Sequence, residues 1–118
     1  MHELSIAVSI AETVEENLPS TDIKVKTVFL KIGKLSGVVK DALTFSFDIA
    51  TQDSSLEGAK LEIEELPVIV HCKHCNKDLE LGNPPIFRCE TCGEATPHII
   101  QGKELEIVSV ELEDDTNT

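Results

Sequence analysis

Apolar residues near the start of the chain recur three or four positions apart. This spacing predicts an amphipathic helix over residues 4–18. Pro19 disfavours helical backbone at the preceding residue, so we expect the helix to end at Leu18. The predicted core face consists of Leu4, Val8, Ala11 and Leu18, widened by Ile6, Ile10 and Val14.

A second helix is predicted over residues 39–51, where the same spacing returns. Asp53, Ser54 and Ser55 follow it and provide a polar exit from the helix. The apolar residues that share its predicted core face are Val39, Leu43, Phe47 and Ala50.

Three other segments have the patterns of β-strands. Residues 25–32 carry β-branched and apolar side chains on both faces, which favours an internal strand. Residues 60–66 alternate apolar with acidic positions, as in a strand with one solvated face. Residues 104–113 are also strand-like, but their apolar phase switches, which predicts a bulge or twist near Val108.

Residues 67–98 interrupt this pattern. They contain all four Cys and few aliphatic residues, so they cannot build a core unaided. If a metal ion holds this insert together, the strands on either side of it can pair. We therefore predict an α+β fold, with two helices on a three-stranded sheet formed by residues 1–66 and 99–118. Residues 67–98 would form an inserted zinc-ribbon-like domain.

Composition narrows the classes of function. The net charge is −12, from 22 acidic and 10 basic residues, and the chain has no Trp or Tyr. Such a chain repels phosphate backbones and anionic lipids and offers few stacking surfaces to nucleic acid. No apolar run approaches the roughly 20 residues of a membrane span, and no signal peptide is evident. We expect a cytoplasmic protein that binds neither nucleic acid nor membrane.

The four Cys form two Cys-x-x-Cys pairs, Cys72 with Cys75 and Cys89 with Cys92, and 13 residues separate the pairs. Four thiolates at this spacing are typical of a tetrahedral Zn²⁺ site. In a reducing compartment they favour a metal over disulfides. Asn76 and Gly93 follow the two pairs. Both residue types tolerate the left-handed backbone of a metal knuckle.

Other uses of these residues stay open at this point. An Fe(Cys)₄ electron carrier needs the same ligands. Redox catalysis is disfavoured, because a thioredoxin-like pair normally lies at a helix start after a strand, whereas these two pairs flank a Pro-rich loop. His71, His74 and His98 lie beside the Cys in sequence, and any of them could replace a thiolate. A zinc-ribbon module for nucleic acid is a further alternative, although the insert carries slightly more acidic than basic residues.

The first three residues form a second candidate metal site. The α-amine of Met1, the backbone amides and the imidazole of His2 are nitrogen donors within one continuous chelate. Such donors suit Ni²⁺ or Cu²⁺ in square-planar geometry. The Glu3 carboxylate would add an oxygen ligand or orient another ligand. The motif is short, and an incidental N-terminal His is the competing interpretation.

Several segments along nearly the whole chain resemble the HypA/HybF family. Two departures are Asn76, where the family often has Gly, and Glu90, where it often has Pro; neither removes a ligand. The resembling segments are Met1-His2-Glu3-Leu4-Ser5, residues 33–38, Leu43-Thr44-Phe45-Ser46-Phe47, residues 56–63, the paired Cys-x-x-Cys and residues 101–107.

The resemblance implies a non-enzymatic nickel carrier that acts in NiFe-hydrogenase maturation. Its implied partners are a HypB-type GTPase and the hydrogenase large-subunit precursor, with urease maturation proteins as further candidates. Position by position, His2 with the Met1 amine and nearby amides would hold Ni(II), and Glu3 would assist. Cys72, Cys75, Cys89 and Cys92 would hold Zn(II). Consistently, the sequence contains no nucleophile with its base and no phosphate-binding loop.

Overall fold

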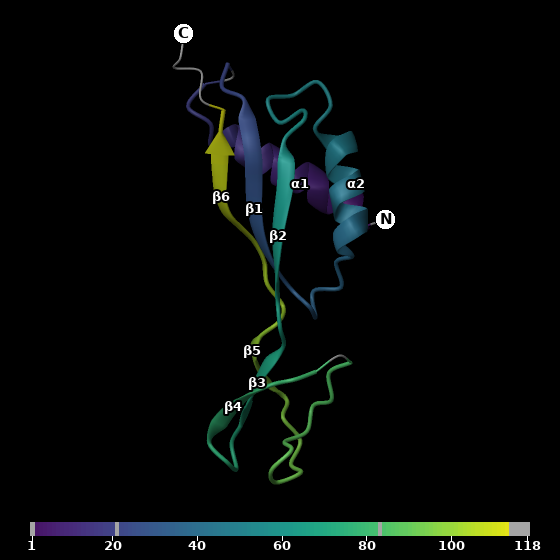
Figure 1. The fold of residues 1–118 in the computed structure, drawn as a ribbon, viewed down its shortest axis with the longest axis vertical. Coiled ribbons are helices and arrows are strands. Elements are labelled where there is room, and N and C mark those ends of the chain that lie inside the picture. The colour runs from purple at the N-terminus through teal and green to yellow at the C-terminus, as the bar shows by residue number, and fades with distance from the viewer. Residues whose placement is uncertain (1, 21, 83, 114–118) are drawn as a thin grey trace. The chain divides into compact units, whose positions relative to one another are not determined.

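The computed structural model describes residues 2–20, 22–82 and 84–113, and for His2 it describes the backbone only. The chain forms two compact units (Figure 1). Unit 1 contains the described parts of residues 1–30, 38–64 and 106–118, and unit 2 contains those of residues 31–37 and 65–105. Whether residues 67–98 fold as a separate domain, as predicted from the sequence, stays a prediction.

The structure contains two helices and a three-stranded sheet in which the strand order is β2-β1-β6. This confirms the predicted α+β fold class. Figure 1 shows α1 passing behind the three strands, with α2 beside it. The elements are α1 (His2–Glu16), β1 (Val25–Gly33), α2 (Lys40–Ala50), β2 (Lys60–Leu66) and β6 (Leu105–Leu112).

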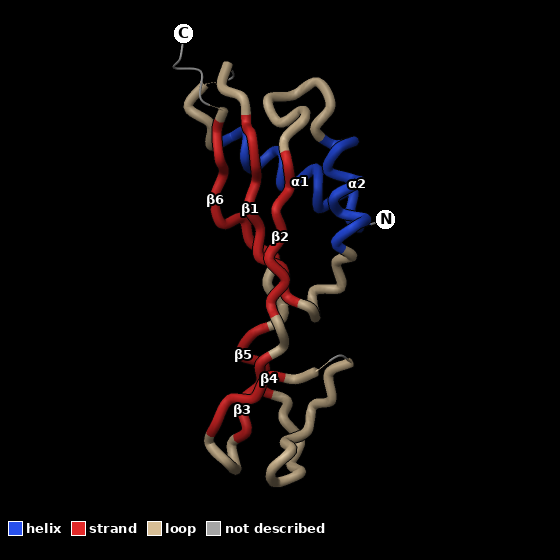
Figure 2. The backbone as a smooth tube through the Cα atoms, in the orientation of Figure 1, coloured by secondary structure: helices blue, strands red, loops and turns tan. Residues whose placement is uncertain are grey.

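Two backbone hydrogen bonds at the start of β1 show how the strands run. Val25 N–H donates to Ser55 O at 3.0 Å, just before the chain enters β2. Glu113 N–H donates to Lys24 O at 2.9 Å, just after the chain leaves β6. β1 and β2 are therefore parallel, and β6 is antiparallel to β1. Figure 2 shows α2 as the helical crossover that a parallel pair requires.

The buried face of α1 differs from the predicted one. Ala7, Ile10, Ala11 and Val14 are buried, whereas Leu4 is 44% exposed and Val8 is 38% exposed. The prediction that Leu4 and Val8 face the core is wrong. Apolar residues occupy so much of this helix that spacing alone defines a wide stripe, and packing against the neighbouring elements selects its centre. α1 and α2 contact one another directly.

The core of α2 follows the prediction at Leu43 and Phe47, which are buried. Val39 is an exception, because it is 57% exposed and precedes the helix as its N-cap residue. Its predicted place on the core face is therefore wrong. An N-cap residue has extended rather than helical backbone, so its side chain leaves the helical repeat.

β1 is the internal strand that its sequence predicts. Because β1 lies between β2 and β6, the expected direct pairing of the two strands that flank residues 67–98 is wrong. Val28, Leu30 and Ile32 are buried, and Phe29 on the other face is half-buried. β6 is an edge strand, and Val108 is largely exposed. Ile107, Val110 and Leu112 nevertheless line one pocket with the end of α1. The two apolar phases of β6 thus converge on one region, and the predicted bulge near Val108 stays a prediction.

Unit 2 contains a second sheet that the sequence patterns did not predict. Its strands β3 (Ile69–Cys72), β4 (Lys77–Glu80) and β5 (His98–Gln101) pair in the order β4-β3-β5, and both pairings are antiparallel. Each strand has only four residues. Strands of this length carry too few alternations for periodicity to identify them.

Candidate metal centre

The first Cys pair lies on the turn between β3 and β4. Cys72 ends β3 and pairs across the sheet with Lys77, which begins β4. Cys75 lies within this turn, and its backbone N–H donates to Cys72 Sγ at 3.4 Å. Asn76 adopts a left-handed backbone with φ of 53°. The left-handed residue closes the turn and brings both thiols to the same side.

The second pair lies on a similar turn between residues 88 and 95. Cys89 N–H donates to Glu94 O at 2.9 Å, and Gly93 N–H donates to Cys89 O at 2.8 Å. Gly93 has a positive φ of 75°. The left-handed backbone expected at Asn76 and Gly93 is therefore confirmed. Arg88 Nη1 donates to Gly93 O at 2.9 Å and reinforces the turn.

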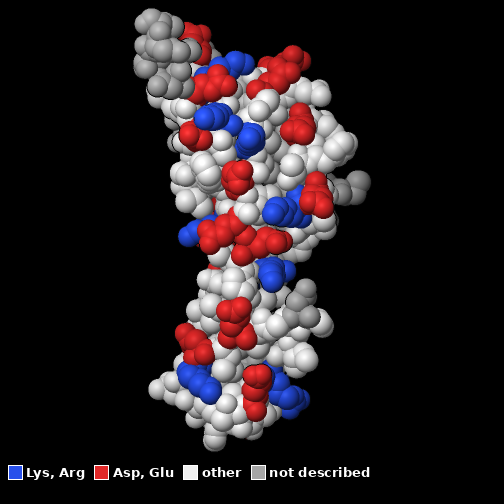
Figure 3. Space-filling view, in the orientation of Figure 1, with Lys and Arg blue, Asp and Glu red and all other residues white. Residues whose placement is uncertain are grey.

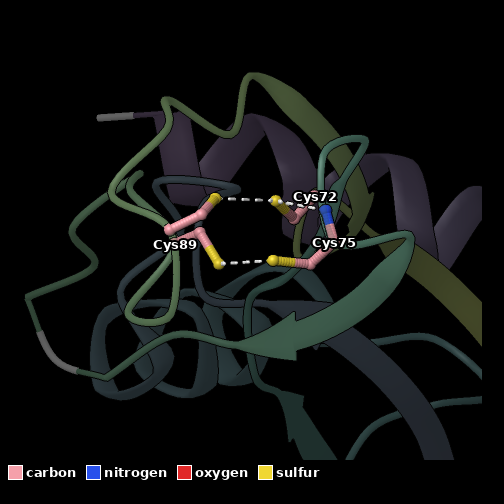
Figure 4. Close-up of side chains that lie close together, drawn as sticks. Cys72, Cys75 and Cys89 are labelled. Atoms are coloured by element: carbon pink, nitrogen blue, oxygen red, sulfur yellow. Dashed lines mark hydrogen bonds between the residues drawn. The ribbon is translucent and has the colours of Figure 1, made fainter.

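The four thiols meet at one point. Figure 4 shows the labelled Cys72, Cys75 and Cys89 with sulfurs turned toward one another. The Sγ atoms of Cys72 and Cys92 are 3.6 Å apart, those of Cys75 and Cys89 are 3.8 Å apart, and all four lie within 4.8 Å of one another. A tetrahedron with metal–sulfur bonds of about 2.3 Å has edges of about 3.8 Å. The arrangement therefore fits one tetrahedral ion.

These distances also exclude disulfides, because a sulfur–sulfur bond measures only about 2.05 Å. All four Cys are free thiols. Cys72 and Cys89 are buried, and Cys75 and Cys92 are half-buried. Four protein ligands leave no position for water or substrate, which is typical of a structural rather than a catalytic metal site. Between the two turns, Lys77 Nζ donates to Thr91 Oγ1 at 3.0 Å.

The fold separates the pKa values of these thiols. The backbone N–H of Cys92, assisted by that of Thr91, stabilises the Cys89 thiolate and lowers the pKa of Cys89 to about 6. Desolvation and the neighbouring thiols raise the pKa of Cys75 to about 12. At Cys92, the Glu94 backbone lowers the pKa, but desolvation and the Cys72 and Cys89 side chains outweigh it and raise the pKa. The Cys89 thiolate therefore forms easily, whereas ionisation of Cys75 and Cys92 needs a cation beside them.

No histidine belongs to the four-thiol cluster. Among the residues that the structure describes, the only group of three or more potential ligands is formed by Cys72, Cys75, Cys89 and Cys92. His71, His74 and His98 instead line a common pocket. The sequence had left open whether one of them replaces a thiolate, and the geometry favours the four Cys.

The predicted nickel ligands are placed only in part. Met1 lies outside the described residues. His2 is the first residue of α1, and its side chain is not described. Glu3 lies in the first helical turn, and its Oε2 accepts a hydrogen bond from Val39 N–H at 3.1 Å. This contact between the two helix starts was not predicted from the sequence, because it joins residues far apart along the chain.

On the face shown in Figure 3, acidic and basic side chains are interspersed, and the described residues form no broad basic patch there. Neither described helix combines the length and apolar character needed to cross a bilayer.

Comparison with known proteins gives consistent matches. The family model described as "Hydrogenase/urease nickel incorporation, metallochaperone, hypA" matches residues 1–112. The hydrogenase maturation factor HypA of Roseiflexus sp. (strain RS-1) is 48% identical over 117 residues, which cover 98% of this chain and 95% of that protein. HypA of Desulfosudis oleivorans is 45% identical over 116 residues, covering 97% of this chain and 100% of that protein.

A solved structure supports the same assignment. The solution structure of the Ni metallochaperone HypA from Helicobacter pylori matches with a TM-score of 0.64 and 26% identity, covering 93% of this chain and 96% of that one. The family match spans both the helical start and the four-thiol cluster. We conclude that the chain belongs to the HypA family of hydrogenase/urease nickel-incorporation metallochaperones.

Proposed function

We propose that this protein binds Ni²⁺ at its N-terminus through the imidazole of His2, the α-amine of Met1 and nearby backbone amides. Membership of a nickel-incorporation family carries this proposal. The position of His2 at the first residue of α1 supports it. The first four backbone N–H groups of a helix have no partner within the helix, so amide nitrogens at this end are not committed to helical hydrogen bonds.

In this proposal, Glu3 helps to position the nickel ligands that precede it in the chain. One of its carboxylate oxygens accepts the Val39 N–H, which holds the first turn of α1 beside the start of α2. A carboxylate held in this way orients its neighbours and adds negative charge close to the cation. Glu3 thus acts as a positioning residue for the ligands beside it.

The four-thiol site holds Zn²⁺ in a structural role in our proposal. The tetrahedral sulfur arrangement and the lack of an open ligand position favour an ion that shapes unit 2 and takes no part in transfer. Iron would fit the same four sulfurs. Metal analysis of the purified protein distinguishes the two ions. Its visible absorbance does so too, because an Fe(Cys)₄ protein is coloured and a zinc protein is not.

We propose that the bound nickel is used in hydrogenase maturation, as the family name indicates. We propose that a HypB-type GTPase and the NiFe-hydrogenase large-subunit precursor are the partners, and that urease maturation proteins are a second outlet. The carrier works in a reducing cytoplasm, where the thiols stay free. Transfer needs only exchange of ligands, so the chain itself performs no catalysis.

Nickel titration of the zinc-loaded protein tests the proposal. His2→Ala, and separately one residue added before Met1, should each weaken the tightest site by more than about 100-fold. Changes in outer-shell groups alone cost about 10–100-fold, and both variants disturb direct ligands. Affinity should also fall with pH, because the amine must lose a proton to bind.

His74→Gln is the matched control, since it removes an imidazole elsewhere and should leave the tightest site intact. Zinc content should be the same in all four proteins. Unchanged nickel affinity after the N-terminal extension would refute the proposed ligand set.

A further inference from the structure

Three polar side chains form a row across the sheet of unit 2. His71 on the central strand β3 lies directly opposite Asp78 on β4 and directly opposite His98 on β5. Residues directly opposite one another in antiparallel strands project from the same face, with Cβ atoms about 4.5–5.5 Å apart. The register therefore places a carboxylate, an imidazole and a second imidazole side by side.

The central imidazole is already oriented. His71 Nδ1 and Asp78 Oδ1 are 2.8 Å apart. An ionised carboxylate only accepts hydrogen bonds, so Nδ1 of His71 carries the proton and donates it. In the neutral ring this leaves the Nε2 lone pair available. A carboxylate bound to one ring nitrogen, with the other nitrogen free, is the usual arrangement behind a metal-binding His.

The second imidazole lies within reach of the first. The ring centroids of His71 and His98 are 6.3 Å apart, with ring planes at 81°. Both rings line an open pocket of about 370 Å³, together with His74, Glu94 and Lys73. Imidazole nitrogens bind a divalent ion at about 2.0–2.1 Å, a distance that side-chain rotation at two opposite strand positions can provide.

This row is separate from the four thiols. Successive residues of a strand project to opposite faces, so His71 and Cys72 point away from each other. Cys72 is buried, as is Cys89, whereas the side chain of His71 is 27% exposed. Neither His71 nor His98 belongs to the thiol cluster. A cation on the row would thus be additional to the structural ion.

A contribution to the stability of the fold does not by itself explain why these three polar side chains lie in a row. The Asp78 side chain is 58% exposed, and exposed ion pairs contribute little to stability. Lys73 and Glu94 both line the pocket, so their charges offset one another there, and the Asp78 carboxylate adds negative charge beside His71. Two imidazoles backed by a carboxylate match the preference of first-row divalent ions such as Ni²⁺, Cu²⁺ and Zn²⁺.

We propose that His71 and His98 form a second, weaker divalent-cation site, with Asp78 orienting His71 and water completing the coordination. The site does not depend on the proposed N-terminal nickel site. It gives unit 2 a solvent-accessible position for a transition-metal ion in addition to the structural ion proposed for the four thiols.

The test uses full-length, zinc-loaded protein carrying His2→Ala, so that the N-terminal site does not mask weaker binding. Ni²⁺ is the probe, and binding is followed by calorimetry. One residual site is expected. Adding His71→Gln or His98→Gln should weaken it at least tenfold, and adding Asp78→Asn should weaken it about tenfold through the loss of ring orientation. Zinc content should stay unchanged, which shows that the fold of unit 2 is intact.

His74→Gln is the control, because His74 lines the same pocket but stands outside the row; it should change the affinity by less than about threefold. Paramagnetic Ni²⁺ should also broaden the ring NMR signals of His71 and His98 before those of His74. Absence of residual binding, or equal losses in the His71, His98 and His74 variants, would overturn the proposal. Failure of the N-terminal site would appear instead in the titration of protein that retains His2.

Discussion

Glu3 Oε2 accepts a hydrogen bond from the backbone N–H of Val39 at 3.1 Å, which joins the first turn of α1 to the N-cap of α2. Val39 has no side-chain group that can cap its own helix. A carboxylate at a helix N-terminus is favourable because it meets free N–H groups and the positive end of the helix dipole. This contact, above all, lowers the pKa of Glu3. The residue next to His2 is thus fixed by a partner 36 positions away.

Glu3→Gln should weaken Ni²⁺ binding about tenfold. The amide keeps the size of the side chain and one acceptor oxygen, but it loses the charge near the proposed ligands. Because the folded pKa of Glu3 is lowered, its contribution to stability is present above its ordinary pKa and is lost as pH falls through the lowered value. Nickel titration, and acid unfolding of wild type and variant, measure both effects.

Asp41→Asn is the matched control, since Asp41 is an acidic residue in the first turn of α2. It should leave nickel affinity unchanged. Equal losses in the Glu3 and Asp41 variants would mean that the overall charge of the region matters rather than the Glu3 contact.

In metal-free, reduced protein, one thiol should ionise near pH 6 and others only above pH 9. The first is Cys89, whose pKa is lowered to about 6, and Cys75 is among the last because its pKa is raised to about 12. The ultraviolet absorbance of thiolates follows each step. Cys89→Ser should remove the step near pH 6, whereas Cys75→Ser should keep it. Retention of that step in the Cys89 variant would contradict the assignment.

The same shifts have opposite effects on the stability of the metal-free fold. The Cys89 contribution is complete above the ordinary pKa of 9.0 and is lost as pH falls through about 6. The Cys75 contribution is complete below 9.0 and is lost as pH rises through about 12. Together they favour greatest stability near pH 9. Zinc binding at neutral pH should therefore release protons from Cys75 and Cys92, measurable by calorimetry in buffers of different ionisation enthalpy.

The sequence predicts those parts of the molecule that depend on local patterns. The strand at residues 60–66 has the predicted limits, and the four Cys meet as their spacing predicts. Local sequence patterns fail to predict burial and register where contacts between residues far apart in the sequence determine them. Leu4 and Val8 fit a helical stripe yet are exposed, because Ala7 and Ala11 occupy the buried face. The Asp78–His71–His98 row depends on the register of short strands, which no local pattern specifies.

Thr96→Val should stabilise the zinc-loaded protein by about 1 kcal/mol. Thr96 is fully buried, and its Oγ1 has no hydrogen-bond partner among the described residues. An unsatisfied buried hydroxyl costs about 1–3 kcal/mol, and Val keeps the shape of the side chain without the hydroxyl. Thr96→Ser keeps the hydroxyl and loses a methyl group, so it should destabilise by about 0.8 kcal/mol. Denaturant unfolding compares the variants, and a destabilised Val variant would indicate an unseen partner for Oγ1.

Gly33→Ala should destabilise the protein by about 3 kcal/mol or more. A Cβ atom at Gly33 would lie 2.1 Å from both the carbonyl carbon and the oxygen of Gly102. Backbone cannot swing aside as a flexible side chain can, and overpacking alone commonly costs about 1–3 kcal/mol. Relief of the clash would also strain the hydrogen bonds from Gly33 N–H to Glu104 O and from Leu35 N–H to Gly102 O.

Gly82→Ala provides the matched control for this clash. A Cβ at Gly82 has no neighbour within 4 Å, so this change should alter stability by no more than about 0.5 kcal/mol. Thermal unfolding of the two zinc-loaded variants measures the contrast. Similar melting temperatures would show that the backbones at Gly33 and Gly102 can separate without cost. A large difference would show that close backbone approach, rather than glycine flexibility, is what position 33 requires.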